Sequence, residues 1–501
     1  MDITPEYSDF AQIYERGENA VIFTRLSADL DTAVSLFLKL TQDRKDAFML
    51  ESVTGGENRG RFSMIGLNPD LVWKCEGDRS FTNRNAARDA DDFTDDDTDP
   101  LSALRALLAE SKIDLPSDLP PMAAGLYGYL GYDMIRLVEH LPDINPDTIG
   151  LPDAVLMRPS VLVIVDGVKD EITICAPVWN GNADSQTAFD AATTRLKRAV
   201  QDLEGNLAHR PTVQNAGEVA PESSNFSKPE YFDVVEKAKE YIRAGDIFQV
   251  VPSQRWTVEF PHQPFALYRA LRRTNPSPYM FYFNFGGFQV IGASPEILVR
   301  VKDNEVTIRP IAGTRPRGAT EAEDQALEVD LLADKKELAE HLMLLDLGRN
   351  DVGRVAKIGT VNPNEQFIIE RYSHVMHIVS NVVGELDEKH DALSALLAGL
   401  PAGTVSGAPK VRAMEIIDEL ETVKRGVYGG GVGYFSSAGD MDICIALRTA
   451  VTKDQKLYIQ AGGGVVYDSD PEAEFQETVN KSNALRRAAQ MAPSFEIDGQ
   501  N

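Results

Sequence analysis

Cysteine and long apolar runs are scarce in this chain of 501 residues. Its three cysteines, Cys75, Cys175 and Cys444, are widely spaced and form no CxxC pair, which fits reduced, buried thiols rather than a disulfide framework. No apolar run approaches the ~18 residues of a membrane-spanning helix. The first residues also lack a basic and apolar signal region. We therefore expect a cytoplasmic protein without a membrane partner.

Positive charge is also in short supply. Fifty basic residues stand against 77 acidic ones, so the formal net charge is −27. Such a balance argues against nucleic acid or an anionic membrane surface as a partner. An anionic substrate would need a local cluster of donors to overcome this field. The composition is otherwise that of an ordinary globular protein, with 43 % hydrophobic and 25 % charged residues.

Nucleotide-binding signatures are absent, although glycine-rich segments are not. Three such segments stand near predicted strands: Pro401–Lys410, Gly426–Tyr434 and Ala461–Val465. None has the GxxxxGK[ST] spacing of a phosphate loop, and no GxGxxG follows an early strand. Consecutive glycines let backbone N–H groups approach a small anion, and they also form ordinary tight turns and bulges.

The periodicity predicts an α+β fold, in which antiparallel β-sheets form a sandwich core and helices pack outside. Residues 205–226 lose periodicity and predict a linker between an N-terminal domain (1–204) and a second domain (227–495). Ser227, Pro229 and Glu230 predict a capped helix start after the linker. Near the end, Gly431–Phe435, Met441–Val451 and Leu457–Ala461 predict a strand meander.

Two predicted helices each carry a pair of glutamates. Residues 334–354 show a helical stripe of Leu338, Leu342 and Leu345, and the pattern breaks at Gly348. Glu337 and Glu340 lie three apart on that helix and share one face. Glu474 and Glu477 repeat the spacing on a helix that Asp470 and Pro471 open. Two such pairs can hold a hard divalent ion such as Mg²⁺, or they can be solvated helix faces.

Three further side chains stand in notable surroundings. Arg448 on the predicted strand Met441–Val451 would share a face with Cys444 and Ala446, with room to reach a carboxylate, or it is a surface arginine. His377 on the predicted strand Tyr372–Val383 is either a core group or an acid–base group. Tyr428 is flanked by glycines, which favours a positioned side chain.

Eight motifs together resemble the chorismate-utilising enzymes, and most closely the large subunits of anthranilate synthases. They are GASPEILVR (292–300), RPIAGTRPRG (309–318), KELAEHLMLLDLGRND (336–351), RYSHVMHIVS (371–380), GTVSGAPKVRAME (403–415), GVYGGGVGYF (426–435), DICIALRT (442–449) and QAGGGVVYDSDPEAEFQETVNK (460–481). The resemblance implies amination of chorismate at C2 and then loss of pyruvate, which yields anthranilate.

The resemblance also implies roles for individual residues. Glu340 and Glu477 match Mg²⁺ ligands, supported by Glu337 and Glu474. The positions that match chorismate binding are Gly313, Thr314, Tyr428, Arg448, Gly462, Gly463 and Gly464. Glu296 matches the acid that protonates the departing 4-hydroxyl, and His377 matches the histidine linked to pyruvate loss.

Three positions distinguish branches of this family. Gln249 stands where isochorismate-forming relatives carry a water-activating lysine, and glutamine cannot act as a base. Ala312 stands where aminodeoxychorismate synthases typically carry a nucleophilic lysine. Thr404 fits the anthranilate branch. The alternatives are aminodeoxychorismate synthase component I and a catalytically silent protein that binds tryptophan or chorismate.

A nitrogen source and an effector complete what the resemblance implies. The chain has no GxCxG elbow with a downstream His-x-Glu, so ammonia should come from a separate glutamine amidotransferase subunit, in a heterotetramer of two large and two small subunits. L-Tryptophan is the expected feedback inhibitor. Its site, to which the N-terminal domain contributes, matches Glu51, Ser52, Pro278, Tyr279 and Met280.

Overall fold

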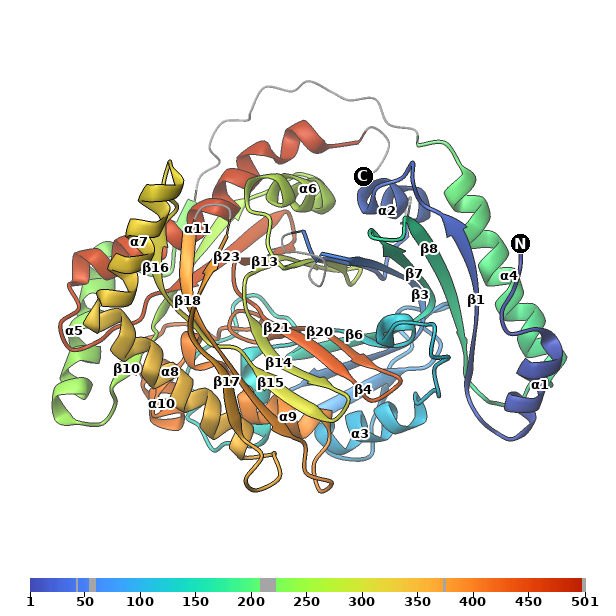
Figure 1. The fold of residues 1–501 in the computed structure, drawn as a ribbon, viewed down its shortest axis with the longest axis horizontal. Helices are drawn as coiled ribbons and strands as arrows, with labels where there is room; N and C mark the ends of the chain where they lie inside the picture. Colours follow the sequence, from blue (N-terminus) through green and yellow to red (C-terminus); the bar gives the residue numbers. More distant parts are fainter. Residues whose placement is uncertain (42–43, 54–59, 208–221, 373–374, 498–501) are drawn as a thin grey trace.

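The computed structural model describes residues 1–41, 44–53, 60–207, 222–372 and 375–497 (Figure 1). Its helices are α1 (Tyr7–Glu15), α2 (Ala33–Thr41), α3 (Pro100–Glu110), α4 (Ser185–Glu204), α5 (Lys228–Ala244), α6 (Pro264–Thr274), α7 (Glu321–Ala333), α8 (Lys335–Gly353), α9 (Ala392–Gly399), α10 (Lys410–Leu420) and α11 (Pro471–Met491), with 3-10 turns η1 (Pro121–Ala123), η2 (Tyr132–Leu137), η3 (Gly403–Val405) and η4 (Ala492–Phe495).

The strands are β1 (Ala20–Ser27), β2 (Ala47–Glu51), β3 (Phe62–Glu76), β4 (Arg79–Asn83), β5 (Thr94–Asp95), β6 (Gly125–Leu130), β7 (Ala154–Asp166), β8 (Glu171–Val178), β9 (Glu222–Ser224), β10 (Gln249–Val250), β11 (Ser253–Glu259), β12 (Tyr279–Asn284), β13 (Gln289–Ser294), β14 (Ile297–Lys302), β15 (Glu305–Ile308), β16 (Ile311–Pro316), β17 (Asn362–Arg371), β18 (Val375–Glu385), β19 (Gly407–Ala408), β20 (Gly431–Ser436), β21 (Met441–Ile445), β22 (Thr449–Lys453) and β23 (Lys456–Gly462).

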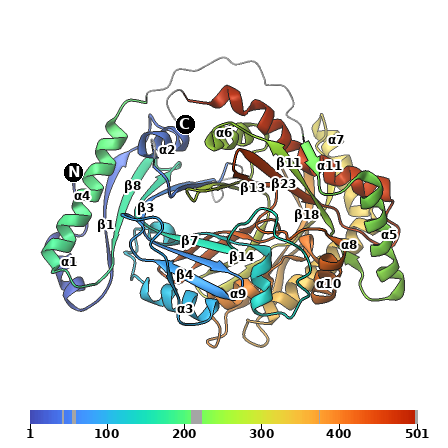
Figure 2. The ribbon, with the colours of Figure 1, turned by 180° about the vertical axis from the view of Figure 1, so that it is seen from behind.

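One antiparallel sheet folds over itself to make two facing layers (Figures 1 and 2). The two longest strands, β3 and β7, contribute buried residues on both sides of these layers. Between Pro69 and Leu71 the register of β3 against β7 shifts, and the preceding Asn68 has a φ of 49°. A bulge of this kind bends a strand and increases its twist, so it lets β3 pass from one layer to the other.

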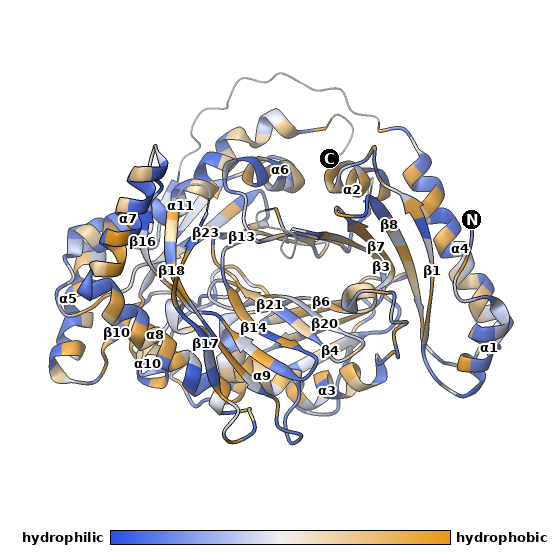
Figure 3. Ribbon diagram, in the orientation of Figure 1, coloured by the Kyte–Doolittle hydropathy of each residue, from blue (hydrophilic) through white to orange (hydrophobic). Residues whose placement is uncertain are grey.

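Apolar side chains fill the space between the layers and the space between each layer and its helices. Phe48, Tyr127 and Phe283 lie in the central core, where their rings stack. A second core lies under α2, α4, α6 and α11, and a third under α3, α8 and α9. Alternation of hydrophobic and hydrophilic residues along α4 is visible in Figure 3. The predicted α+β sandwich with helices outside is confirmed.

Strands from the two predicted domains pair with each other. Strand β2 pairs with β12, and β6 pairs with β20. Of the predicted linker, residues 208–221 lie outside the described residues, whereas Glu222–Ser224 forms β9 along β11. The division into domains at 205–226 stays a prediction.

Predicted helix starts are confirmed where a capping residue indicated them. Ser227 and Glu230 form a capping box at the start of α5. Asp470 accepts a hydrogen bond from the Ala473 N–H at the start of α11, with Pro471 in the first turn. These caps satisfy N–H groups that have no partner inside the helix. Within the described residues no helix is long and apolar enough to cross a membrane.

Two local predictions are wrong. Helix α8 does not break at Gly348 but continues to Gly353, because Gly348 and Asp351 lie on its buried face, and Leu342 is exposed. The predicted strand Met441–Val451 is two strands, β21 and β22, and Arg448 between them has a φ of 48°. This left-handed backbone interrupts the alternation of faces that would have placed Arg448 with Cys444 and Ala446.

Candidate active site

His377 on β18 lies against a bulge of β16 at Gly313. Strand β16 pairs with β18 through Thr314 opposite His377, and the register shifts at Gly313, whose φ is 69°. The His377 Nδ1 lies 2.9 Å from the Gly313 carbonyl oxygen and 3.1 Å from the Thr314 hydroxyl. Because a carbonyl only accepts, Nδ1 carries the proton. Burial lowers the pKa of His377, so its imidazole is neutral at pH 7 and its Nε2 can accept a proton.

Glu296 is a buried carboxyl group between β13 and β14. Thr404 belongs to turn η3, and its hydroxyl lies 3.3 Å from Oε1 and 3.2 Å from Oε2 of Glu296. Burial raises the pKa of Glu296 to about 8, although the hydrogen bond from Thr404 and the charge of Arg448 act in the opposite direction. Glu296 is therefore a neutral acid with a proton to give at physiological pH.

Arg448 stands close to Glu296 at the break between β21 and β22. Its left-handed backbone is held by a hydrogen bond from the Ala293 N–H to its carbonyl oxygen, at 3.2 Å. Burial lowers the pKa of its guanidinium. No carboxylate pairs with Arg448 among the described residues. A partly buried arginine in this state offers two parallel N–H groups to a ligand carboxylate.

The four predicted metal-binding glutamates lie in one acidic cluster on α8 and α11. Burial raises the pKa of Glu340, and the charge of Glu477 adds to this effect. Burial likewise raises the pKa of Glu337, with a contribution from Glu340. Burial raises the pKa of Glu474 to about 7, and Glu477 contributes again. The negative charges of these glutamates thus act on one another across the two helices, while their assignment to a metal stays a prediction.

Gln249 and the glycine strand end lie against this cluster. The Gln249 Nε2 donates to Glu340 Oε1 at 3.0 Å, while its buried Oε1 has no partner among the described residues. A Cβ added at Gly464 would lie 2.6 Å from Gln249 Nε2, and one at Gly463 would lie 3.1 Å from Glu474 Oε2. One at Gly462 would lie 2.9 Å from the Tyr428 hydroxyl. At Gly462 the Cβ would also lie 2.8 Å from the backbone carbonyl oxygen of Pro252, so glycine is required there, whereas a side chain at Gly463 or Gly464 would displace Glu474 or Gln249.

The donor chemistry of the cluster fits Mg²⁺. In the described part of the chain, no three acidic, histidine or cysteine side chains converge as a ready-made metal cage. Mg²⁺ does not require one, because it is usually held by one or two carboxylates together with waters and substrate. The buried Glu474 Oε2 lacks a partner among the described residues, and three carboxyl groups have raised pKa values. Both features indicate a site that needs added positive charge.

Three supporting residues were missed by the sequence reasoning. Lys481 Nζ lies 2.7 Å from Glu477 Oε1 and donates to the Gly462 carbonyl at 3.0 Å. Arg315 lies 3.4 Å from Glu337, and Ser469 donates to Glu474 at 2.7 Å. The spacing of Glu477 and Lys481, four apart on one helix, is the signal that could have found the first of them.

Comparison with known proteins identifies the family of this chain. The family model described as "chorismate binding enzyme" matches residues 45–487. The chain belongs to the chorismate-binding enzyme family.

Relatives of the family are similar along almost the whole chain. A protein of Cereibacter sphaeroides named "Anthranilate synthase component 1" is 68 % identical over 493 residues, 98 % of either chain. One of the same name from Pseudomonas putida is 51 % identical, over 93 % of this chain and 94 % of its own. The crystal structure of anthranilate synthase component I from Streptococcus pneumoniae TIGR4 superposes with a TM-score of 0.76 at 37 % identity, and covers 92 % of this chain and 99 % of its own. The chain is thus a chorismate-binding enzyme.

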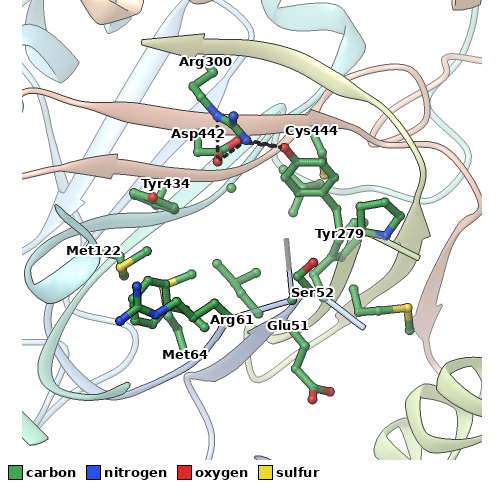
Figure 4. A pocket seen from close by; sticks show the side chains of 18 residues that line it. Glu51, Ser52, Arg61, Met64, Met122, Tyr279, Arg300, Tyr434, Asp442 and Cys444 are labelled. Atoms are coloured by element: carbon green, nitrogen blue, oxygen red, sulfur yellow. Dashed lines mark hydrogen bonds and ion pairs between the residues drawn. The ribbon is translucent and has the colours of Figure 1, made fainter. Parts of the chain in front are cut away.

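A cavity of about 310 Å³ lies between the two sheet layers (Figure 4). All five residues predicted for tryptophan line it: Glu51, Ser52, Pro278, Tyr279 and Met280. The sequence reasoning missed the other polar and sulfur-bearing side chains of its wall: Arg61, Met64, Met122, Arg300, Tyr434, Asp442 and Cys444. They come from strands and turns far apart in the chain, and so no local pattern links them.

The charged groups of this cavity are arranged as a small network. Arg300 lies 3.0 Å from Asp442 and donates to the Tyr279 hydroxyl at 2.9 Å. The Glu51 carboxylate instead accepts hydrogen bonds from Tyr268 and Arg272 and points away from that pair (Figure 4). Of the two carboxylates in the wall of the cavity, Asp442 is therefore the one that pairs with Arg300, and Glu51 is not.

Proposed function

We propose that this chain is the large subunit of an anthranilate synthase. It aminates chorismate at C2 with ammonia, releases the 4-hydroxyl as water, and then eliminates the enolpyruvyl group as pyruvate, so that chorismate and ammonia give anthranilate, pyruvate and water. The observation that carries the proposal is the buried carboxyl group of Glu296, whose pKa is raised, close to Arg448 and in one site with the glutamates of α8 and α11. The names of relatives at up to 68 % identity support it.

Each step uses a group whose protonation state suits it. Glu296 gives its proton to the departing 4-hydroxyl, and Thr404 orients the carboxyl through its hydroxyl. Arg448, Thr314, Tyr428, Gly313 and the strand end Gly462 to Gly464 surround the substrate. His377, neutral and with a proton on Nδ1, serves the loss of pyruvate and the aromatisation. Gln249 cannot activate water as a base, and so the reaction is reserved for ammonia.

Mg²⁺ would be held by Glu340 and Glu477, with Glu337 and Glu474 in support, and would supply the positive charge that binds a substrate carboxylate in an acidic protein. Lys481 pairs with Glu477, so a protein cation also lies near the position of the substrate carboxylate. A chain of net charge −27 would repel a dianionic substrate. Local cations in the site would offset this repulsion.

Ammonia would come from a separate glutamine amidotransferase subunit. The chain carries no glutaminase motif of its own, and its relatives are named component 1, a name that implies a second component. We propose a heterotetramer of two large and two small subunits in the cytoplasm. The cavity between the sheet layers would bind L-tryptophan as a feedback inhibitor, in keeping with the five predicted residues that line it.

The aminodeoxychorismate alternative requires a lysine nucleophile. Position 312 is alanine, and the nearby amine of Lys410 is buried and engaged with Asp351 at 2.8 Å and with the carbonyls of Ala398 and Gly399. An amine fixed by three acceptors is a structural cation, not a nucleophile.

The test uses the purified chain with chorismate, Mg²⁺ and a high concentration of ammonium salt at alkaline pH. Anthranilate fluorescence is measured, then repeated with EDTA and with L-tryptophan. Fluorescence that needs Mg²⁺ and falls with tryptophan is the expected result. Consumption of chorismate without fluorescence would point to another product of the family, and no consumption would favour a silent binding protein.

A further inference from the structure

A buried ion pair lies directly behind the substrate positions and is used by none of the steps above. Glu421 follows the last turn of α10, and Arg425 is four residues further along. Their side chains are 3 % and 2 % exposed, and Arg425 Nη2 lies 2.5 Å from Glu421 Oε1. Burying such a pair costs desolvation energy, and well-packed apolar residues often stabilise a fold as well or better. Its presence behind a site therefore needs another explanation.

Arg425 joins two loops that carry site residues. Its Nη1 donates to the Val405 carbonyl at 2.6 Å, next to Thr404. Its Nη2 donates to the Val251 carbonyl at 2.7 Å, two residues after Gln249. A planar guanidinium fixes the directions of its donors, so these bonds set where the two loops lie relative to each other.

The same guanidinium fixes a third element. Its central carbon lies 5.6 Å from the ring centre of Tyr428 and 4.8 Å from that of Tyr132. The Tyr428 hydroxyl in turn interacts with the backbone N–H of Gly462. Arg425 thus also positions the aromatic ring next to the glycine strand end.

Glu421 extends the contact to a fourth element. Its Oε1 accepts hydrogen bonds from the N–H and the hydroxyl of Ser253, both at 2.8 Å. Ser253 is the ladder partner of Gly462 and accepts a hydrogen bond from Gln460 at 2.8 Å. Each nitrogen of the Arg425 guanidinium and each carboxylate oxygen of Glu421 thus has a hydrogen-bond partner despite the burial of the pair.

We propose that Arg425, held by Glu421, is a positioning residue that sets the spacing of Gln249, Thr404, Tyr428 and Gly462 around the substrate. The inference rests on the proposed function for the identity of that substrate. Lysine cannot replace arginine here, because an ammonium cannot donate to two carbonyls and a carboxylate in these fixed directions while lying against two rings.

The test compares Arg425→Lys with Arg158→Lys in the full chain. Arg158 is a matched control: it is also buried, pairs with Asp70 at 2.7 Å and lies against the Trp179 ring, but it contacts none of the site residues. We expect R425K to raise the KM values for chorismate and ammonia and to lower kcat/KM by about 100-fold. R158K should lower the melting temperature with both KM values unchanged.

Each outcome decides the proposal. A general loss of folded protein reduces the apparent kcat but leaves KM unchanged. Unaltered KM values in R425K would therefore overturn the proposal. An equal rise of the KM values in R158K would overturn it as well. If R425K does not fold, Glu421→Gln is measured in the same way, and failure of both to fold would show that the pair holds the fold rather than the site. A wild-type chain without activity on chorismate would instead contradict the proposed function.

Discussion

At the scale of single residues, the burial of one carboxyl group sets both the chemistry and a cost in stability. Glu296 keeps its proton up to a pKa of about 8 because its charged form would lose hydration. Between the ordinary carboxyl pKa and about 8, the folded chain holds a proton that the unfolded chain has released. The free energy of unfolding therefore falls as pH rises through this window.

Replacing Glu296 with glutamine separates these two effects. E296Q should lower kcat by about 100-fold or more, because amide groups do not donate a proton to a leaving hydroxyl. In the wild-type chain, kcat should fall as pH rises through about 8. E296Q should also melt at a higher temperature than the wild type, by a margin that is larger at pH 9 than at pH 5. A margin that does not depend on pH would contradict the raised pKa.

Gly464 provides a second test at this scale, on the packing of backbone against side chains. In Gly464→Ala the new Cβ would lie 2.6 Å from Gln249 Nε2, so Gln249 must move away from Glu340. We expect kcat/KM to fall by about tenfold or more, since small displacements in an active site are costly. Gly181→Ala is the control, because nothing lies within 4 Å of its added Cβ. Equal activities of the two variants would show that the close approach is unimportant.

At the scale of elements, helices α8 and α11 bring two carboxylate pairs to one place. Neutral variants Glu340→Gln and Glu477→Gln should abolish Mg²⁺-dependent turnover with the fold retained. They should also weaken Mg²⁺ binding by about tenfold or more in titration calorimetry, a readout that does not depend on turnover. Glu472→Gln on α11 is the control, because Glu472 pairs with Lys228 at the surface. Unchanged Mg²⁺ affinity and activity in both active-site variants would refute the metal assignment.

The elements also show what local sequence can predict. Ser227 and Asp470 mark true helix starts, because an N-cap depends on residues within one turn. The end of α8 and the break at Arg448 were missed, since they depend on distant partners. Asp351 stays helical against Lys410, and the Arg448 carbonyl accepts from Ala293.

The candidate site shows the same limit. The glutamate pairs follow from helical spacing, but their convergence on Gln249 and Gly464 comes from strand pairing across the chain, as in the bridge between Val250 and Val465. The roles of Glu296 and His377 came from family resemblance. Arg300 and Asp442 are 142 residues apart, and no local pattern connects them.

At the scale of the whole molecule, the cavity between the layers connects the two halves of the chain. Its walls include Glu51 and Arg61 from the first half, and Arg300 and Asp442 from the second. Strand β14, which carries Arg300, begins directly after Glu296, and β21, which carries Asp442, ends three residues before Arg448. A ligand in this cavity therefore contacts the same strands that position two groups of the site. We expect β14 and β21 to carry the coupling between a bound effector and the site, because packed elements pass on displacements to their neighbours.

L-Tryptophan should bind in this cavity through its zwitterionic group, with its ammonium on Asp442 and its carboxylate on an arginine of the wall. It should raise the melting temperature of the chain by about 3 °C when it is present far above its Kd. Asp442→Asn removes a charge-assisted acceptor and should weaken tryptophan inhibition by about tenfold or more, measured as the ratio of ammonia-dependent activity with and without tryptophan.

The control for this prediction is Asp391→Asn, which removes a carboxylate that pairs with Arg105 outside the cavity, at 2.8 Å. Its tryptophan response should match that of the wild type. If Asp442→Asn keeps the full response and the thermal shift, tryptophan binds elsewhere, and the cavity between the layers is not the effector site. If Asp442→Asn loses the thermal shift but is still inhibited, tryptophan binds in the cavity of the wild-type chain, but this binding does not cause the inhibition. The cavity would then transmit no signal along β14 and β21.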